Sequence, residues 1–153
     1  MVKVKRVKKA DIPKLVKLYL KSYKNLEEYA EKDEQGAHRY LLWLYNNCHK
    51  YFLKAELDNG ETIGFIAFDP YWNRSKNRNL EIHEIVVDPE YRNRGVGSFL
   101  IKKAFEIGLK EGDEEAALWV GRKNIKAIKW YKNLGFYKVG EWGKWLRFRK
   151  KLL

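Results

Sequence analysis

The chain is poor in the residues that define disulfide-linked, metal-binding and membrane-spanning proteins. Cys48 is its one cysteine, so an intrachain disulfide is excluded. The histidines His38, His49 and His83 lack the spacing of metal ligands, and we expect no bound metal. No hydrophobic run approaches the ~20 residues of a membrane span, and the start of the chain lacks the apolar stretch of a signal peptide. These absences predict a cytoplasmic protein with no membrane partner.

Charged residues are abundant instead. Lys and Arg number 32 against 20 Asp and Glu, which gives a net charge of +12, and charged residues make up 34% of the sequence. Together with a single methionine, this composition is typical of thermophilic proteins. The hydrophobic fraction of 45% is enough for one core, so the 153 residues predict a single domain over residues 1–153.

A turn rich in arginine and glycine is the feature most informative about chemistry. The apolar run over residues 82–87 predicts a strand, and residues 88–100 lead from it into a helix. Glycines let a backbone approach a ligand closely, and the unpaired N–H groups at a helix start attract anions. Arg92 and Arg94 add positive charge suited to phosphate oxygens. This segment therefore predicts a binding site for a ligand with a polyphosphate group.

The spacing of the glycines distinguishes between the known phosphate loops. A dinucleotide-binding fingerprint requires a third glycine where this chain has Leu100, and a P-loop requires a lysine where Ser98 stands. The pattern that fits is Arg/Gln-x-x-Gly-x-Gly/Ala, which runs from Arg92 to Gly97. It resembles the acetyl-CoA pyrophosphate loop of the GCN5-related N-acetyltransferases, the GNAT superfamily.

A second segment carries the same resemblance. The sequence from Asn124 to Phe136 is similar to the GNAT signature Asn-x-x-Ala-x-x-x-Tyr-x-x-x-Gly-Phe, with Ala127, Tyr131 and Gly135 in place. It also predicts a short helix, because asparagine is a good N-cap and glycine closes helices in a left-handed turn. Two signatures in the order of the family argue against a chance match.

The resemblance and the order of elements predict an α/β fold, a single three-layer GNAT-like domain with a central mixed, mostly antiparallel sheet flanked by helices. The expected strands cover residues 2–7, 51–57, 62–69, 80–87, 116–120, 136–142 and 145–148. The expected helices are one capped by Asp11, one over residues 35–48, one from Gly95 to about Lys110 and one capped by Asn124. A polar loop is expected over residues 73–79.

The resemblance implies that acetyl-CoA is the cosubstrate and indicates where it binds. Backbone N–H groups of residues 85–87 would polarise the thioester carbonyl where a bulge interrupts the strand, as in the family. The residues expected to hold the cosubstrate are Ile85, Val86, Val87, Arg92, Asn93, Arg94, Gly95, Val96, Gly97, Ser98, Asn124, Ala127 and Tyr131. For Asn124, contact with the pantetheine arm and simple capping of its helix are both open.

Acetyl transfer to a lysine-like amine requires a general base, because an amine with a pKa of about 10.4 is almost wholly protonated at pH 7. Glu81 and Glu84 lie on the strand before the phosphate turn, and both are candidates. Glu81 matches the base of histone-type GNAT members, whereas Glu84 is nearer to the thioester in sequence. Residues three apart on a regular strand point to opposite faces, so both line one cleft only at a bulge. The family places Tyr131 as the acid for the departing CoA sulfur, although a core role for this tyrosine and solvent-facing roles for the glutamates are also open.

The amine acceptor is defined only as a class: a peptide N-terminus, a lysine side chain or a small polyamine-like molecule. The acidic segment of residues 26–34 borders the acceptor side in the GNAT layout and would favour a cationic amine, but a solvated helix end also explains it. Members that acetylate ribosomal protein N-termini keep a glutamate one strand later, where this chain has Trp119. That narrower activity is therefore not carried over.

Two alternatives from other classes are kept. The net charge, the basic loop of Arg74, Lys76 and Arg78, and the basic residues 144–151 would suit a nucleic-acid or ribosome-binding module. No RNA-binding signature accompanies them, so nucleic acid is not the expected partner. The other alternative is a GNAT fold that binds acyl-CoA without turnover. The assembly state is open, and a homodimer is possible.

Overall fold

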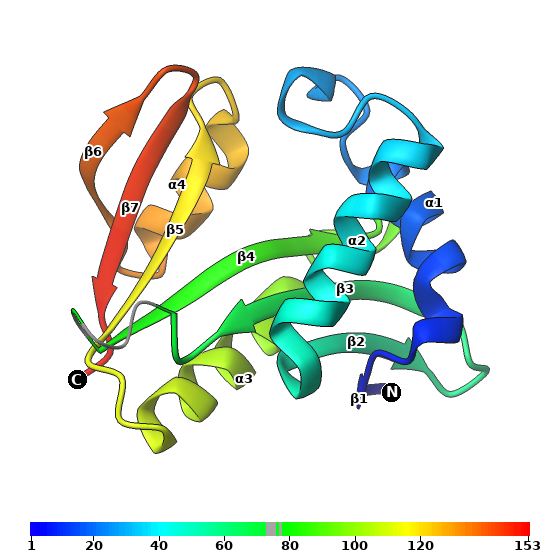
Figure 1. Cartoon of the computed structure of the whole chain (residues 1–153), viewed down its shortest axis with the longest axis horizontal. Helices are drawn as coiled ribbons and strands as arrows, with labels where there is room; N and C mark the ends of the chain where they lie inside the picture. Colours follow the sequence, from blue (N-terminus) through cyan, green and yellow to red (C-terminus); the bar gives the residue numbers. More distant parts are fainter. Residues whose placement is uncertain (73–75, 77) are drawn as a thin grey trace. The chain divides into compact units, whose positions relative to one another are not determined.

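The computed structural model describes residues 1–72, 76 and 78–153, so Arg74 and most of the expected loop over residues 73–79 lie outside the described residues. Within the described residues, seven strands form one sheet in the order β1-β2-β3-β4-β5-β7-β6 (Figure 1). The strands are β1 (Val2–Arg6), β2 (Phe52–Leu57), β3 (Thr62–Asp69), β4 (Asn79–Val87), β5 (Glu115–Gly121), β6 (Tyr137–Trp142) and β7 (Trp145–Lys151). The α-helices are α1 (Ile12–Ser22), α2 (Glu34–Cys48), α3 (Val96–Lys110) and α4 (Ile125–Asn133).

The sheet is mixed and mostly antiparallel. Antiparallel pairs join β1 to β2, β2 to β3, β5 to β7 and β7 to β6. The strands β4 and β5 run parallel and pair Asn79–Ile82 with Glu115–Leu118. This topology, with helices beside the strands, confirms the predicted α/β class.

The chain divides into two compact units. The first comprises Met1–Phe68 and Glu84–Ala104, and the second comprises Asp69–His83 and Phe105–Leu153. Both β4 and α3 contribute residues to each unit. A single domain over the whole chain stays a prediction.

In the first unit, helices cover both faces of the strands. Figure 1 shows α2 in front of β2 and β3, and the beginning of α3 behind them. Gly64 on β3 allows the close packing, because a Cβ there would lie 2.8 Å from the Val86 carbonyl oxygen and 3.4 Å from the side chains of Val96 and Leu100. The buried face of α1 carries Leu15 and Tyr19, in line with the spacing of its apolar residues.

The second unit has its core between the β5–β7–β6 ladder and its helices. Phe148 on β7 is fully buried, and the ring of Phe136 lies 5.6 Å from Tyr131 and 6.1 Å from Phe105. The strand β6 follows the turn at Gly135, whose φ of +99° ends α4 in the left-handed conformation. The predicted role of this glycine as a helix stop is confirmed.

One predicted cap differs from the structure. Asp11 does precede α1, but its carboxylate accepts the N–H of Lys8 at 2.7 Å and so caps the 3-10 turn Lys9–Asp11 instead of α1. Its other oxygen bonds the Lys54 ammonium at 3.0 Å. Pro13 in the first turn of α1 has no N–H group, so the start of this helix has one donor fewer to satisfy and does not depend on that cap. Across the described part of the chain, no helix combines the length and apolarity that crossing a membrane requires.

Candidate active site

A carboxyl group held by two tyrosines is the main chemical feature of the first unit. Glu84 on β4 accepts a hydrogen bond from the Tyr23 hydroxyl at 2.5 Å and another from the Tyr40 hydroxyl at 2.8 Å. Tyr23 follows the last residue of α1, and Tyr40 lies in α2. The ring of Tyr19 packs 4.9 Å from Tyr23 and 5.6 Å from Tyr40. Three segments of the chain thus place one acidic group among aromatic rings.

The surroundings change the proton affinity of this carboxyl group. Burial raises the pKa of Glu84 to about 7, although the hydrogen bonds from Tyr23 and Tyr40 favour the ionised form. Burial, and then the Glu84 charge, raise the pKa of both tyrosines well above the usual value, so they remain protonated donors. A carboxyl group that titrates near neutral pH is suited to accept a proton from an amine.

The Arg92–Gly97 turn has the backbone shape of an anion-binding loop. Asn93 and Gly95 have φ values of +63° and +83°, and α3 begins at Val96. The residues from Arg92 to Gly95 are exposed, whereas Val96 is buried. A left-handed turn that opens a helix points successive N–H groups outward, which is how backbone binds phosphate. Gly97 and Ser98 lie in the first helical turn, where such N–H groups have no partner within the helix.

The side chains of the turn already have partners in the protein. The Arg92 guanidinium donates to the Ser22 carbonyl at 2.9 Å, and the Arg94 guanidinium lies 5.2 Å from the centre of the Tyr91 ring. Just before the turn, the Lys21 ammonium binds Asp88 at 3.0 Å and Glu90 at 2.7 Å. The end of α1 is therefore attached to the segment that leads into the loop.

The strand residues before the turn are closely packed. Val86 is buried, Ile85 and Val87 are half-buried, and the N–H of Asp88 bonds the Ile63 carbonyl at 2.8 Å. The bulge that the family resemblance implies in this strand stays a prediction, as does the role of the three amides.

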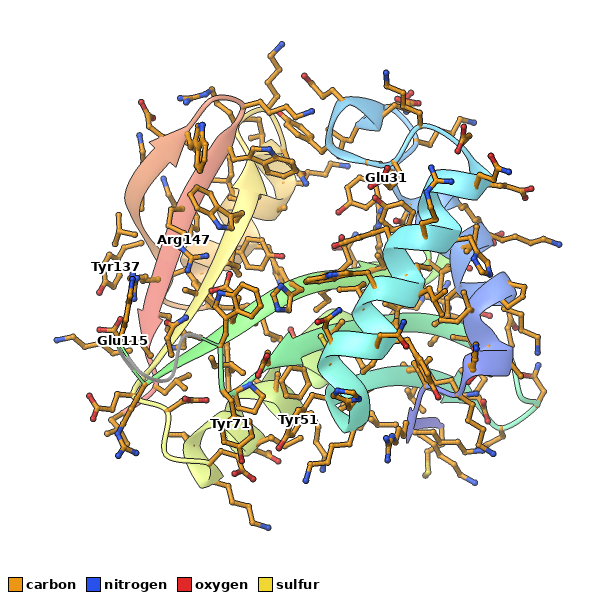
Figure 2. The ribbon with its side chains drawn as sticks, in the orientation of Figure 1. Glu31, Tyr51, Tyr71, Glu115, Tyr137 and Arg147 are labelled. Carbon is orange, nitrogen blue, oxygen red and sulfur yellow. The ribbon has the colours of Figure 1, made fainter. Side chains whose placement is uncertain are left out.

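In the second unit, Glu81 has a different partner from Glu84. Both of its oxygens accept from the Arg147 guanidinium at 2.7 Å, and Figure 2 shows Arg147 projecting from β7. Asn79 donates to the same carboxylate at 3.2 Å, and Arg147 lies 5.0 Å from the centre of the Trp119 ring. Glu81 is 4% exposed. A bidentate guanidinium occupies an acceptor position on each carboxylate oxygen and leaves few positions for another donor.

The second signature forms a capped helix. The Asn124 side chain accepts the N–H of Ala127 at 3.4 Å, so this residue caps α4. Tyr131 is 8% exposed, and its ring packs 5.1 Å from Trp130. Among the described residues, no three His, Cys, Asp or Glu side chains gather as metal ligands do.

These features agree with a comparison to known proteins. Residues 12–136 match the family described as the acetyltransferase (GNAT) family. The chain belongs to this family. GNAT membership makes it an acyltransferase that uses acetyl-CoA, and several of its relatives are named as N-acetyltransferases.

Individual relatives cover different shares of the chain. It is 39% identical over 151 residues to an uncharacterized N-acetyltransferase, MJ1207, of Methanocaldococcus jannaschii, which covers 97% of this chain and 66% of that protein. A thialysine N-epsilon-acetyltransferase of Sus scrofa is 42% identical over 87 residues, 57% of this chain and 51% of that protein. The crystal structure of PH1933 from Pyrococcus horikoshii OT3 superimposes with a TM-score of 0.85 at 30% identity, covering 99% of this chain and 98% of that chain.

Two residues of this GNAT protein were not connected to the site by sequence reasoning. Tyr40 was expected only on the face of a helix, and Arg147 only as one of several basic residues near the C-terminus. No local pattern relates them to their partners, because 44 residues separate Tyr40 from Glu84 and 66 separate Glu81 from Arg147.

Several charges singled out in the sequence have roles within the GNAT fold. Asp33, from the acidic segment, caps α2 by accepting the Gly36 N–H at 2.7 Å. Arg149 binds Glu115 at 3.1 Å, and the Lys150 ammonium lies over the ring of Phe105. Part of the basic C-terminal segment is therefore engaged in its own unit.

Proposed function

We propose that this enzyme transfers an acetyl group from acetyl-CoA directly to a primary amine, with Glu84 as the general base. The observation that carries the proposal is the hydrogen-bonded position of Glu84 between Tyr23 and Tyr40, together with a pKa raised to about 7. An amine that arrives protonated must lose a proton before it can attack a thioester. Glu84 would accept that proton, directly or through one water molecule.

The remaining predicted site residues supply the other parts of the reaction. The loop from Arg92 to Ser98 would bind the pyrophosphate of acetyl-CoA through its N–H groups, and Asn124 and Ala127 would lie along the pantetheine arm. Amides of residues 85–87 would stabilise the oxyanion that forms when the amine nitrogen bonds to the carbonyl carbon. As the carbon–sulfur bond breaks, Tyr131 would give its phenolic proton to the thiolate and would regain one from the nitrogen, which loses its second proton as the amide forms.

Glu81 is the weaker candidate for the base. Its bidentate ion pair with Arg147 supports a structural role, because both carboxylate oxygens are already bonded to the guanidinium. We therefore assign the base to Glu84 and the stabilisation of the second unit to Glu81.

The acceptor proposed is an amine on a flexible side chain or small molecule, such as the ε-amine of lysine or a polyamine. A base with a raised pKa matters most for strongly basic amines, whereas an α-amine is partly neutral at pH 7. The similarity to a thialysine N-epsilon-acetyltransferase over 87 residues supports the same class.

The test is to incubate the protein with acetyl-CoA and a panel of amines, and to detect acetylated products by mass spectrometry. The panel would contain a polyamine, a lysyl peptide with a blocked N-terminus and a peptide with a free α-amine only. We expect the first two to be acetylated, and Glu84→Gln to lower kcat/KM by at least about 100-fold, within the usual range for a general base. The matched control is Glu61→Gln in the exposed turn before β3, which should keep the wild-type rate.

Two results would contradict the proposal. Acetylation of the α-amine peptide alone would exclude the proposed acceptor class. A wild-type rate in Glu84→Gln would remove Glu84 as the base.

A further inference from the structure

The hydrogen bonds to Glu84 restrict the direction from which its carboxylate can accept a proton from an amine. Each carboxylate oxygen accepts one tyrosine hydroxyl, from Tyr23 on one and Tyr40 on the other. A carboxylate offers about four acceptor positions, so the two tyrosines occupy half of them and fix the plane of the group. The remaining positions then point in a constant direction.

We propose that Tyr23 and Tyr40 are positioning residues, whose hydroxyls orient the Glu84 carboxylate and hold it ionised for the incoming amine. This inference rests on the proposed function, in which Glu84 is the base. Neither tyrosine is asked to exchange a proton, because burial and the neighbouring carboxylate keep both in the protonated form.

The packing around the two tyrosines supports this role. The ring of Tyr19 lies against both, and its own hydroxyl accepts the N–H of Glu31 at 3.0 Å. Tyr19 thus restricts how the rings move and is bonded elsewhere itself. Among the residues that the structure describes, the titratable groups that interact with Glu84 are Tyr19 and Tyr23 from the α1 segment and Tyr40 from α2.

The end of α1 fixes the position of Tyr23 in turn. Lys21 binds Asp88 and Glu90, and the Ser22 carbonyl accepts from Arg92. Tyr23 is the next residue, so three consecutive positions bind the strand and loop that carry the base and the predicted phosphate site. The orientation of Glu84 is therefore set by the same segment that meets the loop.

The expected effect has a defined sign. Hydrogen bonds donated to the carboxylate lower its pKa, so removing one in Tyr23→Phe or Tyr40→Phe raises it. The acid limb of kcat/KM should then move to higher pH by about one unit, the scale of one hydrogen bond to a charged group. Dividing the value of each variant by the wild-type value at every pH cancels the ionisation of the amine itself.

The experiment measures this ratio between pH 5.5 and 9 for Tyr23→Phe, Tyr40→Phe and the control Tyr45→Phe on the same helix as Tyr40. We expect the ratio for the first two variants to be about tenfold lower at the acid end than at the alkaline end. The ratio for Tyr45→Phe should be constant. A ratio that is lowered equally at all pH values would show a merely structural role and overturn the proposal.

A second measurement does not depend on turnover. In protein labelled with ¹³C at the glutamate carboxyl, the Glu84 resonance is the one that disappears in Glu84→Gln, and its titration midpoint can be followed by NMR. The midpoint should rise in both tyrosine variants, and an unchanged midpoint would overturn the inference. If one variant fails to fold, the other decides the outcome. A wild-type rate in Glu84→Gln would instead disprove the proposed function, and the NMR midpoints keep the two failures distinct.

Discussion

Glu81 and Glu84 are three residues apart on β4 and have opposite electrostatic surroundings. Glu84 is bonded to neutral hydroxyls in the first unit, where burial raises its pKa to about 7. Glu81 is bonded to a guanidinium in the second unit. Glu84 thus has uncharged hydrogen-bond partners and Glu81 a cationic one, which suits the two carboxylates to separate tasks on one strand.

The role of Glu81 can be tested through its partner. Arg147→Met leaves a 4% exposed carboxylate without its counter-charge and should destabilise the protein by about 3 kcal/mol. The control is Arg149→Met on the same strand, whose partner Glu115 is about a third exposed (34%), and which should change stability by less than about 1 kcal/mol. Urea denaturation measures both.

The kinetics of Arg147→Met test whether Glu81, and not Glu84, is the base. The acid limb of kcat/KM for folded Arg147→Met should stay at its wild-type position, because Glu84 sets it. A limb that moves with Arg147→Met and not with Glu84→Gln would assign the base to Glu81.

At the scale of elements, the glycines of the turn between β4 and α3 determine its backbone conformation. Glycine adopts a positive φ without the steric clash that other residues meet. Gly95 has a φ of +83°, so the turn has a left-handed conformation at this position. The binding of a pyrophosphate by this turn stays a prediction.

A pair of glycines allows that prediction to be tested without confusing stability with binding. Gly60 in the β2–β3 turn and Gly95 have φ values of +88° and +83°, and a Cβ at either would meet nothing within 4 Å. Alanine should therefore destabilise the protein by about 1–2 kcal/mol at both positions. Calorimetry with acetyl-CoA should show weaker binding for Gly95→Ala and wild-type binding for Gly60→Ala. Equal affinities for the two variants would remove the turn from the cosubstrate site.

At the scale of the whole molecule, the fold was more predictable than the contacts of the site. Strand β3 was expected over residues 62–69 and is observed there, because an apolar run that follows turn residues is a local signal. Boundaries that depend on pairing were less accurate, and β7 continues to Lys151 because it pairs with β5 along its whole length. The partners of Glu84 were not predicted as a set, because they come from residues 61 and 44 positions away.

The free energy of unfolding should depend on the protonation of the half-buried Glu84 carboxyl group. Its pKa is about 7 in the folded state against 4.5 for the free group, so the folded state binds a proton more tightly. The resulting contribution to the free energy of unfolding is about 3 kcal/mol. It is fully present below pH 4.5 and is lost as the pH rises to 7. Gln at this position does not titrate.

The measurement is the free energy of unfolding of wild type minus that of Glu84→Gln, from denaturant curves between pH 4 and 8. We expect the difference to fall by about 3 kcal/mol over this range, since groups common to both proteins cancel. A difference that is flat with pH would mean that Glu84 titrates in the folded protein as it does in water.

Three consecutive residues, Lys21, Ser22 and Tyr23, are attached to β4 and the turn after it. These contacts should keep the length of α1 unchanged in evolution. Each residue of an α-helix advances the chain by about 1.5 Å and rotates it by about 100°. An insertion or deletion of one codon between Ile12 and Lys21 would thus turn all three attachments away together. Substitutions on the solvent-facing side of α1 should be tolerated, whereas a change in the number of its residues should not.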